Sequence, residues 1–400
     1  MSLVKNRIIR ECLPNGISVL LRQMPVQEYL VGLSGKGGSI GNRRESLPDG
    51  AAHMLEHVLI RQLSPQTKEK YDINGKTTQT HISIYGHGKS NNKSAELAKE
   101  LLSAMHHSVS RDSMEKEMPR IENEIKHVQN TASEKHENFV SKVFENTPLA
   151  SSILGTPETL QKITRNNLQS FLQNTFTAGN TLLVAVGNIN PEEILKTARE
   201  HPALKNSSQM DGLPSTEPDR VQIKDAFSDQ GTYAVQDRVQ KTFQKEKNSL
   251  HDETSTVLIG YKIPYRKNIK SYASYLAIAH SIEKHSLAAG LNLSPQLYYT
   301  DAGGLLFFAI PKNVYKNISI ASMVEKAAEN IKKDIEQFKH SKPSRITLQQ
   351  LDLPSYLFSI GLGSLTEEEL LSSLKKLETS DITEGLKIFN KKPYIMEVSS

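Results

Sequence analysis

The chain has 400 residues, more than one ordinary domain needs, and this length favours two or three domains. Apolar residues make up 37% of the chain, which is enough for buried cores and excludes a disordered protein. The net charge of +5 comes from 49 basic and 44 acidic residues without a basic stripe that alternates with aromatic residues, so we expect no nucleic-acid partner. The single cysteine, Cys12, excludes a disulfide framework and a thiolate zinc cluster, so a bound metal would need His, Asp or Glu ligands.

The pattern of apolar residues disfavours two further classes of protein. No stretch approaches the ~18 consecutive apolar residues needed to cross a bilayer, so we expect no membrane span. Residues 1–10 carry basic side chains, but the apolar core that a secretory signal requires does not follow them. The sequence therefore predicts a cytoplasmic protein.

The first half of the chain predicts an alternation of strands and helices. The Asn15-Gly16 turn leads into a strand at residues 17–21, and a second strand at 29–34 runs into a glycine-rich segment. This segment, residues 35–41, lacks the order of a phosphate-binding loop, and we expect a flexible turn with no helix at its end. The later predicted elements are a helix at 51–62, a strand at 77–85, helices at 94–109 and 115–144, a strand at 181–186 and a helix beginning near Pro191.

A change of composition divides the chain near its middle. Residues 201–219 are rich in Pro, Ser, Asn, Asp and Gly, which is typical of a linker. The elements predicted beyond it are strands at 256–263 and 304–310 and helices at 271–289, 323–338 and 367–376. This order resembles that of the first half. We therefore predict an α+β protein with two similar domains, residues 1–205 and 223–400, joined by a linker at 206–222.

Two histidines in the helix predicted at 51–62 give the strongest chemical signal. His53 and His57 are four residues apart, so they project from one face of the helix and can share a metal ion. Glu56 lies close enough to act on a water molecule at that metal. The pattern H-x-x-E-H is the inverzincin signature. Because the chain has 13 histidines, this pattern alone is only moderately specific.

A catalytic zinc usually has three protein ligands, so a third must come from another element. In the following long helix, Glu117 and Glu124 share a face with Ile121 and Val128, where a carboxylate is costly unless a cation meets it. Glu124 is therefore the candidate ligand, with a surface position as the alternative. His127, one turn further on, is a second candidate, for which a surface role is favoured.

Several segments of the chain occur in the order found in a known family. The chain resembles the pitrilysin/insulinase family of inverzincin metallopeptidases, in particular its short two-domain, processing-peptidase-like members. The segments that carry this resemblance are residues 13–16 (Leu-Pro-Asn-Gly), 37–39 (Gly-Gly-Ser), 50–57 (Gly-Ala-Ala-His-Met-Leu-Glu-His), 148–149 (Pro-Leu), 153–155 (Ile-Leu-Gly) and 184–188 (Val-Ala-Val-Gly-Asn). The second half matches more loosely, through its order of strands and helices. The resemblance implies two processing-peptidase/LuxS-like domains, each with a mostly antiparallel sheet and helices.

The resemblance also implies which Glu completes the site. In the family the third ligand follows a supporting Glu by seven residues, and Glu117 and Glu124 reproduce this spacing. The distance from His57 is shorter than usual and by itself favours Glu134. The position of Pro148 downstream favours Glu124, and the missing residues then belong before the strand at 77–85, where a helix is shortened to 64–71.

The expected site is one zinc ion held by His53, His57 and Glu124. Glu56 would be the catalytic base that takes a proton from water and passes it to the leaving amine. Glu117 would be either a second catalytic residue that orients a ligand or the base, or a buried structural partner.

Substrate contacts are also implied by the resemblance. The family binds an extended peptide along an edge strand beside the zinc, which we expect to be the strand at 77–85. Thr78 and Gln79 stand there in place of the family's Asn-Ala pair. A tyrosine of the second half, Tyr298 or Tyr299, would hold the substrate carbonyl. The arginine that the family also uses is missing, because residues 291–293 are Leu-Asn-Leu.

These expectations favour a zinc-dependent endopeptidase that acts on short peptides or on leader and targeting segments. Short members of the family correspond to half of larger four-domain enzymes, so a homodimer or a heterodimer with a related subunit is implied. The missing arginine favours an alternative, a weakly or non-catalytic peptide-binding subunit of a heterodimeric protease. A maturase for a bacteriocin-type precursor peptide is a third possibility.

Overall fold

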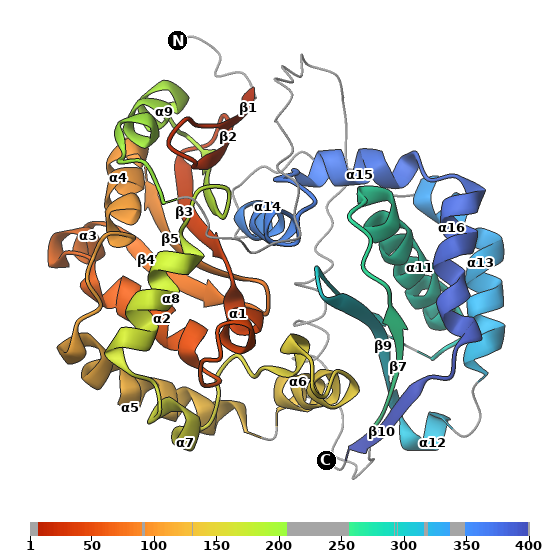
Figure 1. Cartoon of the computed structure of the whole chain (residues 1–400). Helices are drawn as coiled ribbons and strands as arrows, with labels where there is room; N and C mark the ends of the chain where they lie inside the picture. The colour runs from red at the N-terminus through yellow and green to blue at the C-terminus, as the bar shows by residue number, and fades with distance from the viewer. Residues whose placement is uncertain are drawn as a thin grey trace. The chain divides into compact units, whose positions relative to one another are not determined.

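The computed structural model describes residues 7–89, 93–129, 131–205, 256–291, 293, 295–315, 319–336 and 349–398. They divide into two compact units, each of which is described by itself (Figure 1). The described residues of unit 1 come from Met1–Gln129, Phe144–Phe227 and Pro343–Thr366, and those of unit 2 come from Asn130–Val143, Ser228–Lys342 and Glu367–Ser400. The predicted linker at 206–222 lies outside the described residues.

Unit 1 is built on a six-stranded sheet in the order β1-β2-β6-β3-β5-β4. Its strands are β1 (Arg7–Cys12), β2 (Ser18–Gln23), β3 (Glu28–Lys36), β4 (Asp72–Thr77), β5 (His81–Lys89) and β6 (Thr181–Gly187). Strands β2 and β6 are parallel and the other neighbours are antiparallel. All seven residues of β6 are buried, as expected for a central strand covered on both faces. Strand β4 forms one edge of this sheet.

Helices cover both faces of the sheet of unit 1. They are α1 (Gly38–Arg44), α2 (Ala51–Gln62), α3 (Pro65–Lys70), α4 (Ser94–Ala104), α5 (Arg111–Val128), α7 (Pro157–Leu160), α8 (Arg165–Thr175), α9 (Pro191–Glu200) and α14 (Gln349–Ser359), with a short 3₁₀ helix at Pro148–Ala150. On one face, Val19, Leu21 and Leu183 share a core with residues of α2, α4, α8 and α9. On the other face, Leu20 and Val184 belong to a second cluster, against which Phe358 of α14 packs.

Unit 2 contains a four-stranded antiparallel sheet in the order β10-β7-β9-β8. Its elements are α6 (Ala132–Val143), β7 (Thr256–Ile263), α11 (Ile269–Ala288), β8 (Pro295–Thr300), β9 (Gly303–Pro311), α12 (Lys312–Tyr315), α13 (Ile320–Glu336), α15 (Glu367–Lys375), α16 (Thr379–Leu386), a 3₁₀ helix at Lys387–Asn390 and β10 (Tyr394–Val398). Phe139 of α6 packs edge-on against Phe307 of β9.

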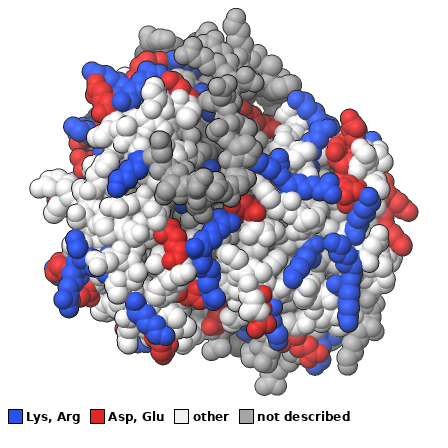
Figure 2. Space-filling view, in the orientation of Figure 1, with Lys and Arg blue, Asp and Glu red and all other residues white. Residues whose placement is uncertain are grey.

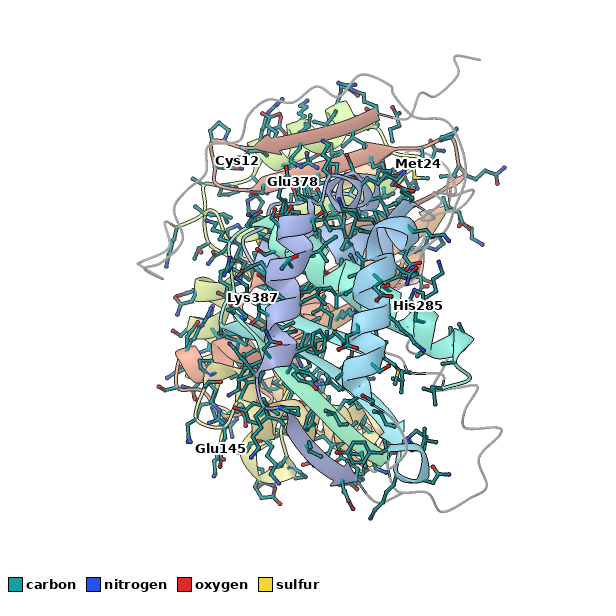
Figure 3. The ribbon with its side chains drawn as sticks, turned by 90° about the vertical axis from the view of Figure 1, so that its right-hand side faces the viewer. Cys12, Met24, Glu145, His285, Glu378 and Lys387 are labelled. Carbon is teal, nitrogen blue, oxygen red and sulfur yellow. The ribbon has the colours of Figure 1, made fainter. Side chains whose placement is uncertain are left out.

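A buried carboxylate holds two helices of unit 2 together. Asp334 of α13 accepts hydrogen bonds from Ser281, Lys284 and His285 of α11. Burial alone would raise the pKa of the Asp334 carboxyl, but these donors outweigh it and lower that pKa. Figure 3 faces the helices of this unit and labels His285 together with Glu378 and Lys387, which flank α16.

Each half of the chain contributes one helix to the unit of the other half. Helix α6 belongs to unit 2, although it precedes the predicted linker, and α14 belongs to unit 1, although it follows that linker. Ser355 and Ser359 of α14 hydrogen-bond Ser34 and Thr80 of unit 1, at 2.8 Å in both cases. The two-part division is therefore present, but the predicted boundaries at 1–205 and 223–400 omit this exchange.

Most predicted elements of the described residues are present, and three predictions need correction. Helix α2 and strand β7 have the predicted bounds. The segment at 35–41 is not a flexible turn, because β3 extends to Lys36 and α1 begins at Gly38. The strand predicted at 77–85 is divided by a turn between β4 and β5. The helix predicted at 115–144 is divided into α5 and α6, and Thr131 accepts a hydrogen bond from the Glu134 N–H where the second helix begins.

The surface of the described residues carries both signs of charge. On the face drawn in Figure 2, Lys and Arg side chains lie among Asp and Glu side chains. Within the described part of the chain, no helix is both long and apolar enough to span a membrane.

Candidate metal centre

Helix α2 positions the two motif histidines. It begins after Gly50, which has a left-handed backbone (φ 90°) that suits glycine, and its residues from Ala51 to Glu56 are all buried. Its N-terminus is capped from α1, because the Asn42 side chain accepts a hydrogen bond from the Ala52 N–H at 2.9 Å. Asn42 is itself fully buried. The first turn of the helix is therefore fixed next to the motif.

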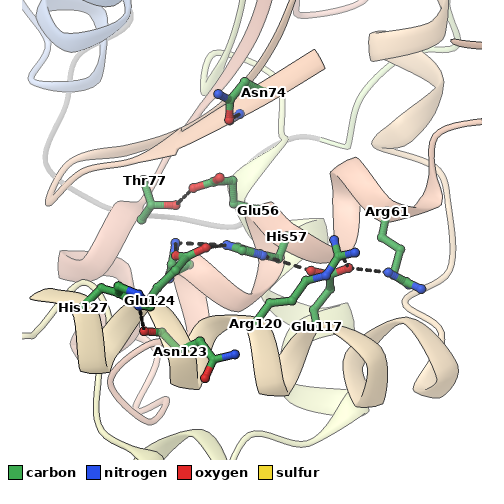
Figure 4. Close-up of polar contacts among 12 residues, drawn as sticks. Glu56, His57, Arg61, Asn74, Thr77, Glu117, Arg120, Asn123, Glu124 and His127 are labelled. Atoms are coloured by element: carbon green, nitrogen blue, oxygen red, sulfur yellow. Dashed lines mark hydrogen bonds and ion pairs between the residues drawn. The ribbon is translucent and has the colours of Figure 1, made fainter. Parts of the chain in front are cut away.

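Three possible ligand atoms converge between α2 and α5 (Figure 4). The Nε2 atoms of His53 and His57 are 3.2 Å apart. The Glu124 carboxylate lies 3.5 Å from His53 Nε2 and 3.6 Å from His57 Nε2. Glu124 reaches them because α5 continues through Pro119 as one helix. The structure thus brings together the three residues predicted as ligands.

These separations fit a tetrahedral zinc ion. With zinc–ligand bonds of about 2.0–2.1 Å, tetrahedral ligand atoms lie about 3.4 Å apart. The three observed separations, 3.2, 3.5 and 3.6 Å, bracket this value. Two imidazoles and one carboxylate are also a donor set that catalytic zinc uses. The residues present therefore fit the metal that the sequence predicts.

Glu117 fixes the orientation of the second histidine. Its Oε2 atom lies 3.1 Å from His57 Nδ1, so this nitrogen carries the proton and the Nε2 lone pair faces the convergence point. Its Oε1 atom accepts a hydrogen bond from Arg61 at 2.6 Å. Burial opposes ionisation of Glu117, but the hydrogen bonds from Arg61 and His57 outweigh it and lower its pKa. Glu117 thus contacts a predicted ligand and is also a buried ion-pair partner.

The first histidine is held in its neutral form by burial. Burial, with a smaller contribution from His57, lowers the pKa of His53 to about 3. Its Nδ1 atom is buried and has no hydrogen-bond partner among the described residues. No hydrogen bond at Nδ1 therefore orients this ring, unlike that of His57.

Glu56 lies beside the histidines, against strand β4. One of its carboxylate oxygens comes within 4.8 Å of ligand atoms of His53 and His57. The Thr77 hydroxyl donates a hydrogen bond to it at 2.6 Å. Burial raises the pKa of Glu56 to about 7, although the Thr77 hydrogen bond opposes this shift. A carboxylate with a pKa near neutrality is suited to general-base work at neutral pH.

Gly75 of β4 provides the space for this carboxylate. A Cβ atom at Gly75 would lie 2.5 Å from Glu56 Oε1, so a larger residue would force the Glu56 side chain to move. Glycine at this position thus lets the strand approach the base closely.

The edge strand beside the site is β4, and this corrects the predicted position of the peptide-binding strand. Thr78 and Gln79 lie in the turn between β4 and β5, where the Thr78 hydroxyl accepts hydrogen bonds from the Thr80 and His81 N–H groups. The strand residues that face Glu56 are instead Gly75 and Thr77. Thr78 and Gln79 therefore lie beyond the end of this edge strand, and the asparagine within the strand is Asn74.

The predicted substrate tyrosines belong to strand β8 of unit 2. Tyr299 has only 1% of its surface exposed, and its hydroxyl hydrogen-bonds the backbone N–H and carbonyl of Arg266. It packs among other tyrosine rings as a core residue. Tyr298 is only partly buried. Of the two predicted tyrosines, Tyr298 is thus the one whose side chain is partly exposed and accessible to a ligand.

The alternative ligands have other environments. His127 is exposed and its Nδ1 atom lies 2.6 Å from the Asn123 carbonyl in the same helix. Glu134 is in α6, which belongs to unit 2. Glu115 is exposed and pairs with Arg111 at 2.8 Å. Among the candidate carboxylates, Glu124 is the one beside His53 and His57.

The point where His53, His57 and Glu124 approach one another opens into a polar cavity of about 760 Å³ in unit 1. The lining residues that carry ionisable groups are His53, Glu56, His57, Arg61, Lys68, Lys76, Asp112, Glu117, Arg120 and Glu124. Strand β4 contributes five consecutive lining residues, from Ile73 to Thr77. An edge strand, a base and the candidate ligands therefore face one cavity.

Sequence reasoning did not identify several residues of this site. Arg61 follows His57 by four residues in α2, so helical spacing would have placed it on the same face. Thr77 was assigned to the strand, but its partner Glu56 depends on the tertiary fold. Asn42 caps α2 from a segment in which the sequence predicts no helix, so no local pattern indicates this contact.

Comparisons with known proteins find similarity to peptidases and peptidase subunits. A protein-family model described as the peptidase M16 inactive domain matches residues 162–345. An uncharacterized zinc protease of Rickettsia felis is 28% identical over 215 residues, which are 51% of this chain and 52% of that protein. The beta subunit of the mitochondrial-processing peptidase of Caenorhabditis elegans is 25% identical over 201 residues, which are 47% of this chain and 43% of that subunit. The chain thus covers about half the length of these relatives.

Solved structures share the fold over nearly the whole chain. A putative M16-like peptidase from Alicyclobacillus acidocaldarius has a TM-score of 0.68 at 16% identity, with 100% of both chains covered. A protease from Helicobacter pylori has a TM-score of 0.65 at 15% identity, with 96% of both chains covered. The two-domain α+β architecture is therefore that of M16-like peptidases. Together with the family match and the zinc-protease relatives, it supports the assignment of the chain to the peptidase M16 (pitrilysin/insulinase) family.

Proposed function

We propose that the chain is a zinc-dependent endopeptidase that hydrolyses short peptides or leader and targeting segments. The observation that carries this proposal is the convergence of His53, His57 and Glu124 at separations of 3.2–3.6 Å, with Glu56 beside them. The match to an inactive domain covers residues 162–345, and all four of these residues precede it. The zinc-protease names of the relatives support the same activity.

Each residue has a separate task in this proposal. His53, His57 and Glu124 would hold zinc, which supplies Lewis acidity for water activation and carbonyl polarisation. Glu56 takes the proton of the attacking water and donates it to the leaving amine, and Thr77 orients its carboxylate. Glu117 keeps His57 in the tautomer that presents Nε2.

Strand β4 would bind the substrate backbone. It is an edge strand, and residues Ile73 to Thr77 line the cavity beside Glu56, so an extended peptide can add to the sheet there. This addition would bring a peptide bond close to the base. Tyr298 is proposed as a further substrate-binding residue.

The experiment combines metal analysis with a fluorogenic peptide assay of the full chain. The wild type should contain one zinc per chain and cleave peptides, and Glu56→Gln should keep zinc and lose about 10²–10⁴-fold of the rate. Glu115→Gln is the matched control, because it removes an exposed carboxylate of α5 that forms an ion pair outside the cavity. Zinc at one equivalent without cleavage of any peptide by the wild type would contradict the proposal.

A second candidate is a peptide-binding subunit with little activity of its own, paired with a related subunit. The observations that favour it are the Leu-Asn-Leu sequence at residues 291–293, where the family resemblance implies an arginine, and the burial of Tyr299. Relatives named as processing-peptidase subunits support a heterodimer or homodimer in either case. Addition of a catalytic partner subunit to an inactive chain would test this candidate, and restored cleavage would support it.

A further inference from the structure

We infer that one end of the metal-site cavity, formed by Arg61, Lys68 and Arg120, is a subsite for an acidic group of the peptide substrate. This inference rests on the proposed function, because it assigns a substrate class to the same cavity. The three residues line the cavity together with the metal-binding histidines. We refer to them as the basic end.

The packing of α2 against α5 places the basic end beyond His57. Glu124 contacts His53, and Glu117, two turns earlier in α5, contacts His57 and Arg61. The two helices are therefore antiparallel at the site. In Figure 4, Glu117, Arg120 and Arg61 lie on one side of His57, and Thr77 and Glu124 lie on the other.

The basic end has more positive than negative charge. Arg61 and Arg120 share one oxygen of Glu117, at 2.6 and 3.5 Å, and the other Glu117 oxygen faces His57. Lys68 donates to the backbone carbonyl of Arg61 at 2.7 Å, which is an uncharged partner. The Glu117 carboxylate is thus the shared partner of two guanidinium groups and an imidazole, and a third cation, Lys68, lies beside them.

The acidic residue next to the basic end, Asp112, does not neutralise its excess positive charge. Asp112 also lines the cavity, but its carboxylate accepts a hydrogen bond from Lys116 at 2.8 Å. Burial is the largest cause that lowers the pKa of Lys68, and crowding by the charges of Arg61 and Arg120 lowers it further. A carboxylate of a ligand would relieve this crowding.

Arg120 is the residue best placed to meet such a group. Its side chain is 68% exposed and makes a long contact with Glu117, whereas that of Arg61 is 27% exposed and bound tightly. A guanidinium can bind a carboxylate through two parallel hydrogen bonds. An incoming acidic side chain would therefore find Arg120 at the cavity entrance, with Lys68 beside the same cluster.

The direction of β4 indicates which side of the scissile bond the acidic group occupies. Lys68 lies in α3, just before β4, and Thr77 at the other end of β4 contacts Glu56. A peptide that continues the antiparallel order of β3, β5 and β4 runs from the Thr77 end toward the Lys68 end. The acidic group then belongs to the C-terminal side of the bond that is cut.

The test compares paired fluorogenic peptides that differ only by Glu or Gln at positions C-terminal to the cut. The wild type should prefer the Glu peptide by about tenfold in kcat/KM, because the bonds formed are charge-assisted. Arg120→Glu and Lys68→Glu should abolish or reverse this preference, and added salt should weaken it. Lys126→Glu is the matched control, since Lys126 is an exposed residue of α5 outside the cavity lining.

Binding to the Glu56→Gln chain gives a readout that does not need cleavage. Fluorescence anisotropy with labelled Glu and Gln peptides should show the same preference, and Arg120→Gln should remove it without placing a new carboxylate near Glu117. Zinc content and circular dichroism of each variant report on folding.

The outcomes separate this inference from the proposed function. Equal kcat/KM for the Glu and Gln peptides in the wild type, or an unchanged preference in Arg120→Gln, would overturn the inference and leave the peptidase intact. The cations would then serve only to neutralise Glu117. Absence of cleavage in the wild type, with a Glu preference in binding, would refute the peptidase and retain the subsite.

Discussion

Unit 1 contains two pairs of histidines with nearly the same spacing between their rings and different surroundings. His53 and His57 have Nε2 atoms 3.2 Å apart and ring centroids 4.6 Å apart. His106 and His201 have Nε2 atoms 2.9 Å apart and ring centroids also 4.6 Å apart. Proximity of the imidazoles alone therefore does not distinguish a metal centre from a surface contact.

The groups around each pair make the difference. Glu117 and Glu124 approach the first pair, whereas the second pair has the backbone carbonyls of Leu102 and Pro202 near His201. The first pair is at least half-buried against a cavity, and His106 is exposed. Ligand atoms of His53, Glu56 and His57 lie within 4.8 Å of one another, and among the described residues no such group of three includes His106 or His201. The carboxylates, rather than the histidine spacing, thus mark the candidate metal centre.

The largest expected effect is the loss of zinc from the first pair alone. His57→Ala should reduce bound zinc from one equivalent to none after dialysis, because it removes a ligand at the centre of the donor set. His201→Ala should leave one equivalent. Elemental analysis of both variants measures this, and loss of zinc from His201→Ala would show that the comparison assigns the wrong pair.

Removal of the third candidate ligand tests the role of the carboxylates directly. Glu124→Ala should weaken zinc binding by more than about 100-fold, beyond the effect typical of an outer-shell partner. Glu115→Ala, in the same helix and outside the cavity, should leave the affinity unchanged. Competition with a chelating dye measures both, and equal affinities for the two variants would leave Glu124 as a surface carboxylate.

A smaller effect is expected for the carboxylate that contacts His57 Nδ1. Glu117→Gln keeps the shape of the side chain but removes its charge, so zinc affinity should fall about 10–100-fold. The same chelator competition measures the zinc affinity of Glu117→Gln, and circular dichroism checks that the variant is folded. An unchanged affinity would limit Glu117 to a structural ion pair with Arg61.

The smallest effects concern the caps of the two helices that position the pairs. Asn42→Ala removes the buried acceptor of the Ala52 N–H, and we expect it to lower the free energy of unfolding by about 2 kcal/mol. Asn190→Ala removes the longer cap of α9, at 3.4 Å, and should cost about 0.5–1 kcal/mol. Urea unfolding of the zinc-free chain measures both. A larger loss of unfolding free energy in Asn190→Ala than in Asn42→Ala would show that the cap of α2 contributes less to stability than the cap of α9.

The sequence predicted the elements whose apolar periodicity is long and regular. Helix α2 and strand β7 have their predicted bounds, and the site residues on α2 and α5 followed from helical spacing and from the family order of segments. A helical face brings residues four or seven apart together whatever the tertiary fold is. The ligand candidates could therefore be named from sequence.

The sequence failed where side chains replace the usual turn residues. The segment from Thr77 to His81 has no Gly or Pro, yet the Thr78 hydroxyl accepts two backbone N–H groups and closes a turn. The alternating pattern therefore runs through this turn and places Thr78 and Gln79 in the strand, whereas the strand residues beside Glu56 are Gly75 and Thr77. Arg61, Thr77 and Asn42 act through partners far apart in sequence, which a single sequence does not reveal.

The exchange of α6 and α14 has a consequence for the order of events during synthesis. Strands β1 to β6 leave the ribosome long before residues 349–359, yet the face that carries Leu20, Val184 and their neighbours is covered by α14. While the strands and helices at residues 256–336 are being made, this face lacks its final cover and exposes apolar surface to the cell. Unit 1 is therefore completed only after most of the described residues of unit 2 have been translated.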